Sequence, residues 1–268
     1  MNYFIGIIFF YFLFMNNFIS STSKSKSESE LIPYFNIFNT SNVDSNQNSK
    51  SYKQKNKKNY LRKYNYIKLK TTNVINLKGP ISEKTVNKFL LEFNLHTNKE
   101  DLYVFIDSPG GTVEDGYKII TEFQKYNVSC IAEKAYSMAF AIFQSCNERL
   151  LLPHGKLMQH QISLGIINEL GKIKSYIDYI LQIEEELLNI QSSKIGITSD
   201  DLKNKTNNEW WMFGKNALQE NCADKIINVE CTNELIQETY LINDKSYYYI
   251  YSKCPLIPNY LEKLEISS

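Results

Sequence analysis

Short apolar runs alternate with helical patterns from about residue 72 onward, and this alternation most constrains the fold. The runs NVINLKGPI (73–81), DLYVFID (101–107) and VSCIAEKA (128–135) predict buried strands. The segments between them repeat apolar side chains at helical spacing, with Ser82 as a candidate N-cap. This order predicts an α/β fold with a largely parallel sheet.

The chain continues the same pattern toward its C-terminal half. RLLLP and KLMQHQ predict two short strands around a turn at His154-Gly155, and a long helical pattern runs from about residue 168 to 193. The folded domain is therefore expected over residues 72–230. Residues 231–268 form a C-terminal extension, in which YYYIY predicts a strand.

The first 22 residues predict a signal peptide. Residues 1–20 carry no charged side chain, their apolar run is short for a membrane span, and the small polar residues SSTS follow. A membrane anchor or an uncleaved leader is the alternative. We expect secretory entry and then a plastid-like organelle, with the mitochondrion or another lumen as the alternative destination.

Residues 23–71 are basic and rich in Ser and Asn, and we expect them to be disordered. Residues 21–70 contain eleven Lys or Arg against three acids and show no apolar period. The composition resembles an organelle transit peptide, and a low-complexity linker is the other interpretation. The net charge of the whole chain is only +1, so nothing points to a nucleic-acid partner.

Two loops carry residues suited to acyl-transfer chemistry. Gly110 and Gly111 follow a buried strand and free backbone N–H groups that can stabilise a developing oxyanion. Ser137, in EKAYSMAFAIF, stands at the start of a predicted helix, where the N–H of Met138 has no intrahelical acceptor. A serine nucleophile needs a base, and of the three histidines His160, at the end of a predicted strand, is the best placed.

In order, the motifs SPGG, A-x-SM-A and M-x-HQ resemble the proteolytic subunit of caseinolytic proteases, the ClpP-type serine peptidases. The resemblance covers about residues 74–229. It implies a ClpP/crotonase-like spiral of βαβ units with a protruding handle helix, here residues 168–195. It also implies an endopeptidase that hydrolyses peptide bonds of unfolded proteins inside an oligomeric ring.

The resemblance assigns a role to each matching position. Ser137 falls at the nucleophile and His160 at the general base. The backbones of Gly111 and Met138 fall at the oxyanion hole, and Gly110 and Thr112 at the substrate-binding positions.

The third member of the triad falls at Glu209, where the family has Asp. Glutamate serves this role in some Ser-His-Glu hydrolases. Asp200, Asp201 and Asp224 are the alternatives, although Asp224 also matches a separate family aspartate near the last strand.

The chain departs from the family at Tyr136, which replaces a small residue beside the nucleophile, and in the segment before the first strand. The implied partners are a second copy or a paralogue in a heptameric ring, an AAA+ unfoldase of the Clp type, and unfolded polypeptides. The sequence has no G-x-x-x-x-G-K-[ST] motif, so ATP is expected to be bound and hydrolysed only by a partner ATPase. No cofactor or metal is expected in this chain.

Two other functions stay open. A catalytically silent subunit of the same fold could complete a mixed ring. A crotonase-like hydratase or isomerase is disfavoured, because such enzymes need no Ser–His pair at these positions. Among the five cysteines, Cys130 and Cys146 are expected to be buried packing residues, whereas Cys231 and Cys254 could pair in an oxidising compartment.

Overall fold

A computed structural model describes residues 65–244 and 247–265, so the predicted signal peptide and most of the basic segment lie outside the described residues. A seven-stranded sheet forms the centre, with the order β1-β7-β5-β4-β3-β2 and β6 paired to β5. Its strands are β1 Asn65–Leu69, β2 Val74–Lys78, β3 Tyr103–Ser108, β4 Ser129–Tyr136, β5 Glu148–Gln159, β6 Trp210–Phe213 and β7 Lys225–Cys231. All pairs are parallel except β5–β6. The predicted α/β fold is confirmed.

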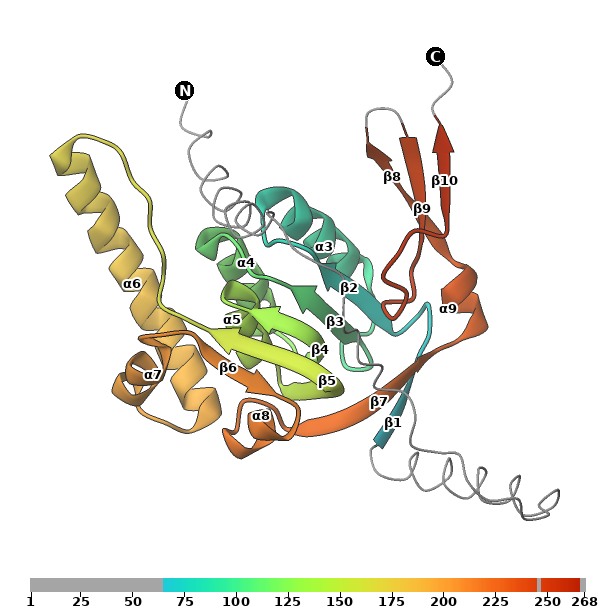
Figure 1. Cartoon of the computed structure of the whole chain (residues 1–268), viewed down its shortest axis with the longest axis horizontal. Helices are drawn as coiled ribbons and strands as arrows, with labels where there is room; N and C mark the ends of the chain where they lie inside the picture. The colour runs from blue at the N-terminus through green and yellow to red at the C-terminus, as the bar shows by residue number, and fades with distance from the viewer. Residues whose placement is uncertain (1–64, 245–246, 266–268) are drawn as a thin grey trace, which may run out of the picture.

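Helices cover one face of this sheet and enclose the main core (Figure 1). They are α3 Glu83–Leu95, α4 Val113–Phe123 and α5 Met138–Gln144. Ser82 caps α3 as the sequence predicts, and Thr85 completes a capping box with it. Val86, Phe89 and Phe93 of α3 are buried in the core.

The long helix α6, Leu170–Ile195, projects from the body of the protein (Figure 1). Its C-terminal part packs into the core through Leu187 and Ile195, and Gly196 ends it in the left-handed conformation. Its N-terminal part exposes apolar side chains, among them Leu170 and Leu181. The shorter helices α7 Ser199–Thr206 and α8 Lys215–Gln219 follow. No described helix has the length and apolar character that a membrane crossing requires.

Two predictions differ from the structure. Residues 65–69, expected to be disordered, form β1 along β7, where Leu69 is fully buried. The strands predicted on either side of His154-Gly155 are a single strand, β5. The β4 ladder is interrupted between Leu151 and Lys156 of β5, around Pro153, which has no N–H to donate.

The C-terminal extension forms a helix and a second sheet. Helix α9 spans Asn233–Gln237, and the strands β8 Thr239–Asp244, β9 Tyr247–Ser252 and β10 Glu262–Glu265 pair antiparallel in the order β10-β9-β8. The strand predicted at YYYIY is therefore confirmed as β9.

Four of the five cysteines form two disulfides, Cys130–Cys146 and Cys231–Cys254. Cys130 and Cys146 are buried as expected, and they also form a disulfide that the sequence did not predict. The segment after α5 lies beside the start of β4, where the N–H of Asn147 donates to the carbonyl of Val128. Cys130 and Cys146 are therefore close to each other. Cys222 is buried and unpaired.

Candidate active site

Ser137 lies on a sharp turn between β4 and α5. Its backbone has φ 54° and ψ −123°, in a region that side-chain-bearing residues rarely occupy. The turn is held because the N–H of Ser137 donates to the carbonyl of Met158 on the neighbouring strand β5 at 2.9 Å. Strained backbone of this kind persists where the surrounding structure enforces it, and such positions cluster at active sites.

His160 lies within hydrogen-bond distance of this serine. Its Nε2 is 2.9 Å from Ser137 Oγ. The strands β4 and β5 are parallel neighbours, so the residues that follow them meet at the same edge of the sheet. The other two histidines lie elsewhere: His96 caps the end of α3, and His154 is exposed beside Glu133. The geometry therefore joins the two residues that the sequence analysis selected.

The two glycines of the SPGG loop are required by close backbone contacts. A Cβ at Gly110, which has φ 89°, would lie 2.5 Å from the carbonyl oxygen of Tyr136 and 2.8 Å from Ser137 Cβ. A Cβ at Gly111 would lie 2.1 Å from the carbonyl oxygen of Ile81. Only glycine lets this loop approach the serine so closely.

Two backbone N–H groups near Ser137 remain available to a ligand. Within residues 65–244 and 247–265, neither the N–H of Gly111 nor that of Met138 donates to another residue. Met138 is the first residue of α5, where N–H groups have no intrahelical acceptor. Its buried side chain packs against Gly116 of α4, where a Cβ would lie 2.3 Å from Met138 Cγ. This contact fixes the start of α5 against α4.

Thr112, the other predicted substrate-binding residue, makes hydrogen bonds within the chain. Its N–H donates to the carbonyl of Ile81 at 2.9 Å, and its hydroxyl donates to the Asp115 carboxylate at 2.6 Å. Burial would raise the pKa of the Asp115 carboxyl, but the hydrogen bonds from Lys118 and Thr112 outweigh it and lower the pKa. These contacts fix the start of α4, which directly follows the glycine loop in the chain.

Glu209 does not contact His160. It is exposed, just before β6, and its carboxylate accepts a hydrogen bond from the indole Nε1 of Trp211 at 2.9 Å. Among the described residues, no carboxylate is hydrogen-bonded to His160. The structure thus brings Ser137 and His160 together and leaves the predicted third member apart from them.

Two of the alternative acids are engaged in structural contacts. Asp224 forms an ion pair with Arg149 at 2.6 Å and accepts from its backbone N–H at 2.7 Å. Asp201 accepts from the hydroxyl of Thr198, which caps α7. In this ion pair Arg149 is buried, whereas the side chain of Asp224 is partly exposed.

A buried pair of glutamines links the long helix to His160, and the sequence analysis missed it. Gln159 Oε1 accepts from the backbone N–H of His160 at 3.2 Å, and Gln159 Nε2 donates to Gln191 Oε1 on α6. Gln191 in turn donates to the carbonyl of Leu187 at 2.8 Å. Both side chains are buried. The available signal was a glutamine at the end of an otherwise apolar strand, directly before the histidine.

Tyr136, the unusual neighbour of the serine, packs against Trp211. Their ring centroids are 5.0 Å apart in an edge-to-face arrangement. The pairing of β4, β5 and β6 places Tyr136, Met158 and Trp211 in one row across the strands. The aromatic pair therefore joins Glu209, through Trp211, to the residue beside the nucleophile. The described residues contain no cluster of three or more His, Cys, Asp and Glu that could hold a metal ion.

Known proteins are similar to this chain over more than half of its length. The sequence model of the Clp protease family matches residues 56–230, more than half of the chain. An ATP-dependent Clp protease proteolytic subunit of Borrelia garinii subsp. bavariensis is 27% identical over 170 residues, which cover 60% of this chain and 88% of that relative. The protein of the same name from Borreliella afzelii is 26% identical over 170 residues, covering 60% of this chain and 86% of that relative.

Proposed function

Because the chain belongs to the Clp protease family, we propose that its Ser137–His160 pair hydrolyses peptide bonds of unfolded polypeptides. The observation that carries this proposal is the 2.9 Å separation of Ser137 Oγ and His160 Nε2. A nucleophile and base at hydrogen-bond distance are the minimal apparatus for acyl transfer. The strained turn at Ser137 and the glycine loop beside it support the same chemistry.

The reaction uses groups already in position. His160 removes the hydroxyl proton of Ser137 as Oγ attacks the substrate carbonyl, and it then gives the proton to the leaving amine. The oxyanion of the tetrahedral intermediate accepts from the N–H groups of Gly111 and Met138. Water, deprotonated by His160, then cleaves the acyl-enzyme and regenerates Ser137.

Glu209 is the proposed third member of the triad. It takes this role by exchanging its hydrogen bond with Trp211 for one with His160, since catalytic hydrogen bonds often tighten only in the substrate complex. A catalytically silent subunit is the second candidate, and the present hydrogen bond from Trp211 to Glu209 favours it.

The chain is further proposed to work as a subunit of a ring, with itself or a paralogue. The exposed apolar side chains on the N-terminal half of α6 support an interface there, namely Leu170, Tyr176, Ile177, Tyr179 and Leu181. The relatives are named ATP-dependent, which supports an ATPase partner for this chain too. The heptameric ring and the Clp-type AAA+ unfoldase remain proposals.

The two disulfides support passage through an oxidising compartment. This accords with secretory entry. The plastid-like destination remains a proposal that follows only from the sequence of the N-terminal segment.

Labelling with a fluorophosphonate probe tests the peptidase proposal. The chain should form a covalent adduct on Ser137, and Ser137→Ala should abolish it while leaving the circular dichroism spectrum unchanged. A folded wild-type chain that forms no adduct, alone or mixed with a paralogue, would overturn the peptidase proposal in favour of the silent subunit.

A further inference from the structure

The face of the sheet opposite α3, α4 and α5 carries a second apolar cluster that the C-terminal extension covers. The sheet contributes Val74, Phe105, Ile131, Leu150, Leu152 and Ile227. The extension contributes Leu235 and Cys254, with the partly buried Ile257 against them. These sheet side chains are at most 5% exposed, and Phe105 and Ile131 are fully buried. Without the extension, this face would be an open apolar surface.

Two polar side chains of β2 hold the covering segment by its backbone. Asn76 Nδ2 donates to the carbonyl of Lys253 at 2.9 Å, and Lys78 Nζ donates to the carbonyl of Pro255 at 2.7 Å. Asn76 and Lys78 lie two residues apart in β2, so their side chains are on the same face of the sheet, and the two acceptors are also two residues apart. The segment that they hold is a turn at residues 254–257, closed by the hydrogen bond from the N–H of Ile257 to the carbonyl of Cys254 at 3.2 Å. The two β2 side chains therefore bind the backbone of this turn beside its apolar contacts with the sheet.

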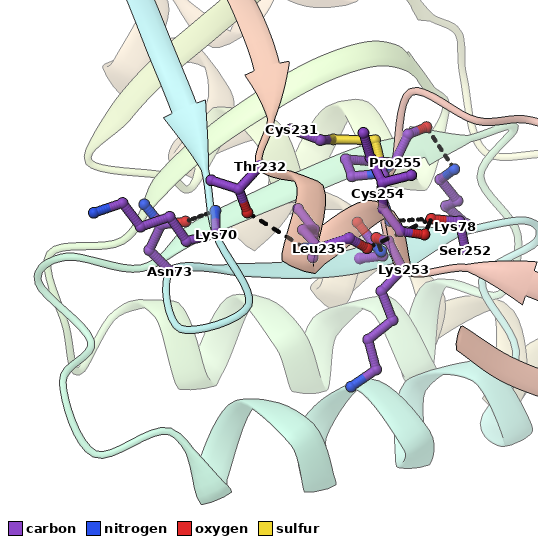
Figure 2. The surroundings of a disulfide bond; sticks show 12 residues. Lys70, Asn73, Lys78, Cys231, Thr232, Leu235, Ser252, Lys253, Cys254 and Pro255 are labelled. Carbon is purple, nitrogen blue, oxygen red and sulfur yellow. Dashed lines mark hydrogen bonds between the residues drawn. A yellow bond between two sulfur atoms is a disulfide. The ribbon is translucent and has the colours of Figure 1, made fainter. Parts of the chain in front are cut away.

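A disulfide locks the same segment in place. Cys231 ends β7, and its bond to Cys254 lies beside Lys78 and Pro255 (Figure 2). The bond closes a loop of the chain that contains α9, β8 and β9. Among residues 65–244 and 247–265, this disulfide is the single covalent cross-link between the covering segment and the end of β7, and it is redox-sensitive.

We propose that this face of the sheet is a docking surface for an apolar peptide segment, which residues 253–257 of the same chain occupy and the Cys231–Cys254 disulfide locks. A dithiol reductant opens the lock. Its thiolate attacks one sulfur to form a mixed disulfide, and its second thiol then displaces the cysteine. Two electrons pass from the reductant, which becomes a disulfide, while Cys231 and Cys254 each end as a thiol.

Hydrogen exchange on the full chain tests the lock. The variant Cys231→Ala with Cys254→Ala removes this bond and leaves Cys130–Cys146 intact. We expect exchange at α9, β8 and β9 to accelerate on the order of 100-fold, in line with the entropy of a loop of this length. Exchange in α4 and α5 should not change. Equal acceleration in every element, or none at the extension, would overturn the proposal.

Peptide binding tests the docking surface itself. The probe is a fluorescent peptide of residues 252–259 carrying Cys254→Ser. It should bind the double-alanine variant, and should bind the oxidised wild-type chain at least tenfold more weakly, because its own segment occupies the site. A control peptide that also carries Ile257→Asp should not bind. Equal binding to both proteins, or to neither, would contradict a site occupied by residues 253–257.

Discussion

Glu209 accepts a hydrogen bond from the indole of Trp211 at 2.9 Å, while His160 is hydrogen-bonded to Ser137. Trp211 also packs against Tyr136, directly before the nucleophile. The acid that the family pattern assigns to the histidine is thus held by the aromatic pair that distinguishes this chain. If Glu209 serves His160 as proposed, it must first give up its hydrogen bond with Trp211.

Trp211→Phe removes the indole donor and keeps an aromatic ring beside Tyr136. If Glu209 serves His160, the fluorophosphonate labelling rate should rise up to about tenfold, because one competing hydrogen bond to a charged group is lost. Phe213→Leu, at another exposed aromatic of β6, is the matched control and should leave the rate unchanged.

Glu209→Gln gives the complementary result. Labelling should fall by about two to four orders of magnitude if the carboxylate orients and stabilises the histidine. An unchanged rate in both Glu209→Gln and Trp211→Phe would remove Glu209 from the triad.

Gly110→Ala should disable the site through the backbone. The added methyl group would lie 2.5 Å from the carbonyl oxygen of Tyr136 and 3.0 Å from the N–H nitrogen of Met138, so the serine turn must move. We expect labelling to fall at least 100-fold, since displacements of about 1 Å have such effects on catalysis. The control is Gly171→Ala in α6, where a Cβ meets open space, and this variant should label normally. Normal labelling of Gly110→Ala would show that the loop is not held against Ser137.

Gln191→Leu should separate the long helix from the histidine. The change leaves the buried Gln159 side chain without its acceptor, which costs about 1–3 kcal/mol in the free energy of unfolding. Labelling should slow as well, because Gln159 also accepts from the backbone N–H of His160. The control Gln182→Leu lies on an exposed part of α6 and should change stability by less than about 0.5 kcal/mol. Denaturant titration measures the free energy of unfolding of both variants, and the fluorophosphonate probe measures their labelling rates. Equal values for Gln191→Leu and Gln182→Leu would contradict a link from α6 to His160 through Gln159 and Gln191.

Sequence reasoning found what periodicity and local chemistry determine. Strand–helix alternation predicted the parallel sheet, and the cap at Ser82 followed from its local context. Ser137 and His160 were selected by their places at a helix start and a strand end together with the family resemblance, and the structure has them 2.9 Å apart. Pairing between segments far apart in the sequence was not predictable. Residues 65–69 form a strand because their backbone pairs with β7 at the edge of the sheet. The approach of Cys130 to Cys146 depends on the return of the chain after α5. The Glu209–Trp211 bond depends on side-chain orientation, which no spacing pattern encodes.

The ion pair of Asp224 and Arg149 should control acid stability. Arg149 is only 2% exposed and also donates to Gln144 and to the carbonyl of Asn221. Burial would raise the pKa of the Asp224 carboxyl, but the hydrogen bonds from Arg149 outweigh it and lower the pKa. A carboxyl whose folded pKa is depressed stabilises the fold above its unfolded pKa of about 3.9, and this contribution is lost as the pH falls through the folded pKa.

Asp224→Asn should therefore lower the free energy of unfolding at pH 7 by about 3 kcal/mol, because it leaves the buried Arg149 without a counter-charge. The stability of the wild type should decline below about pH 4 more steeply than that of the variant. Glu148→Gln, which breaks the exposed pair with Lys225, is the control and should cost less than about 1 kcal/mol. Denaturant titrations between pH 3 and 7 measure all three proteins. Parallel pH profiles for the wild type and Asp224→Asn would show that another carboxyl governs acid unfolding.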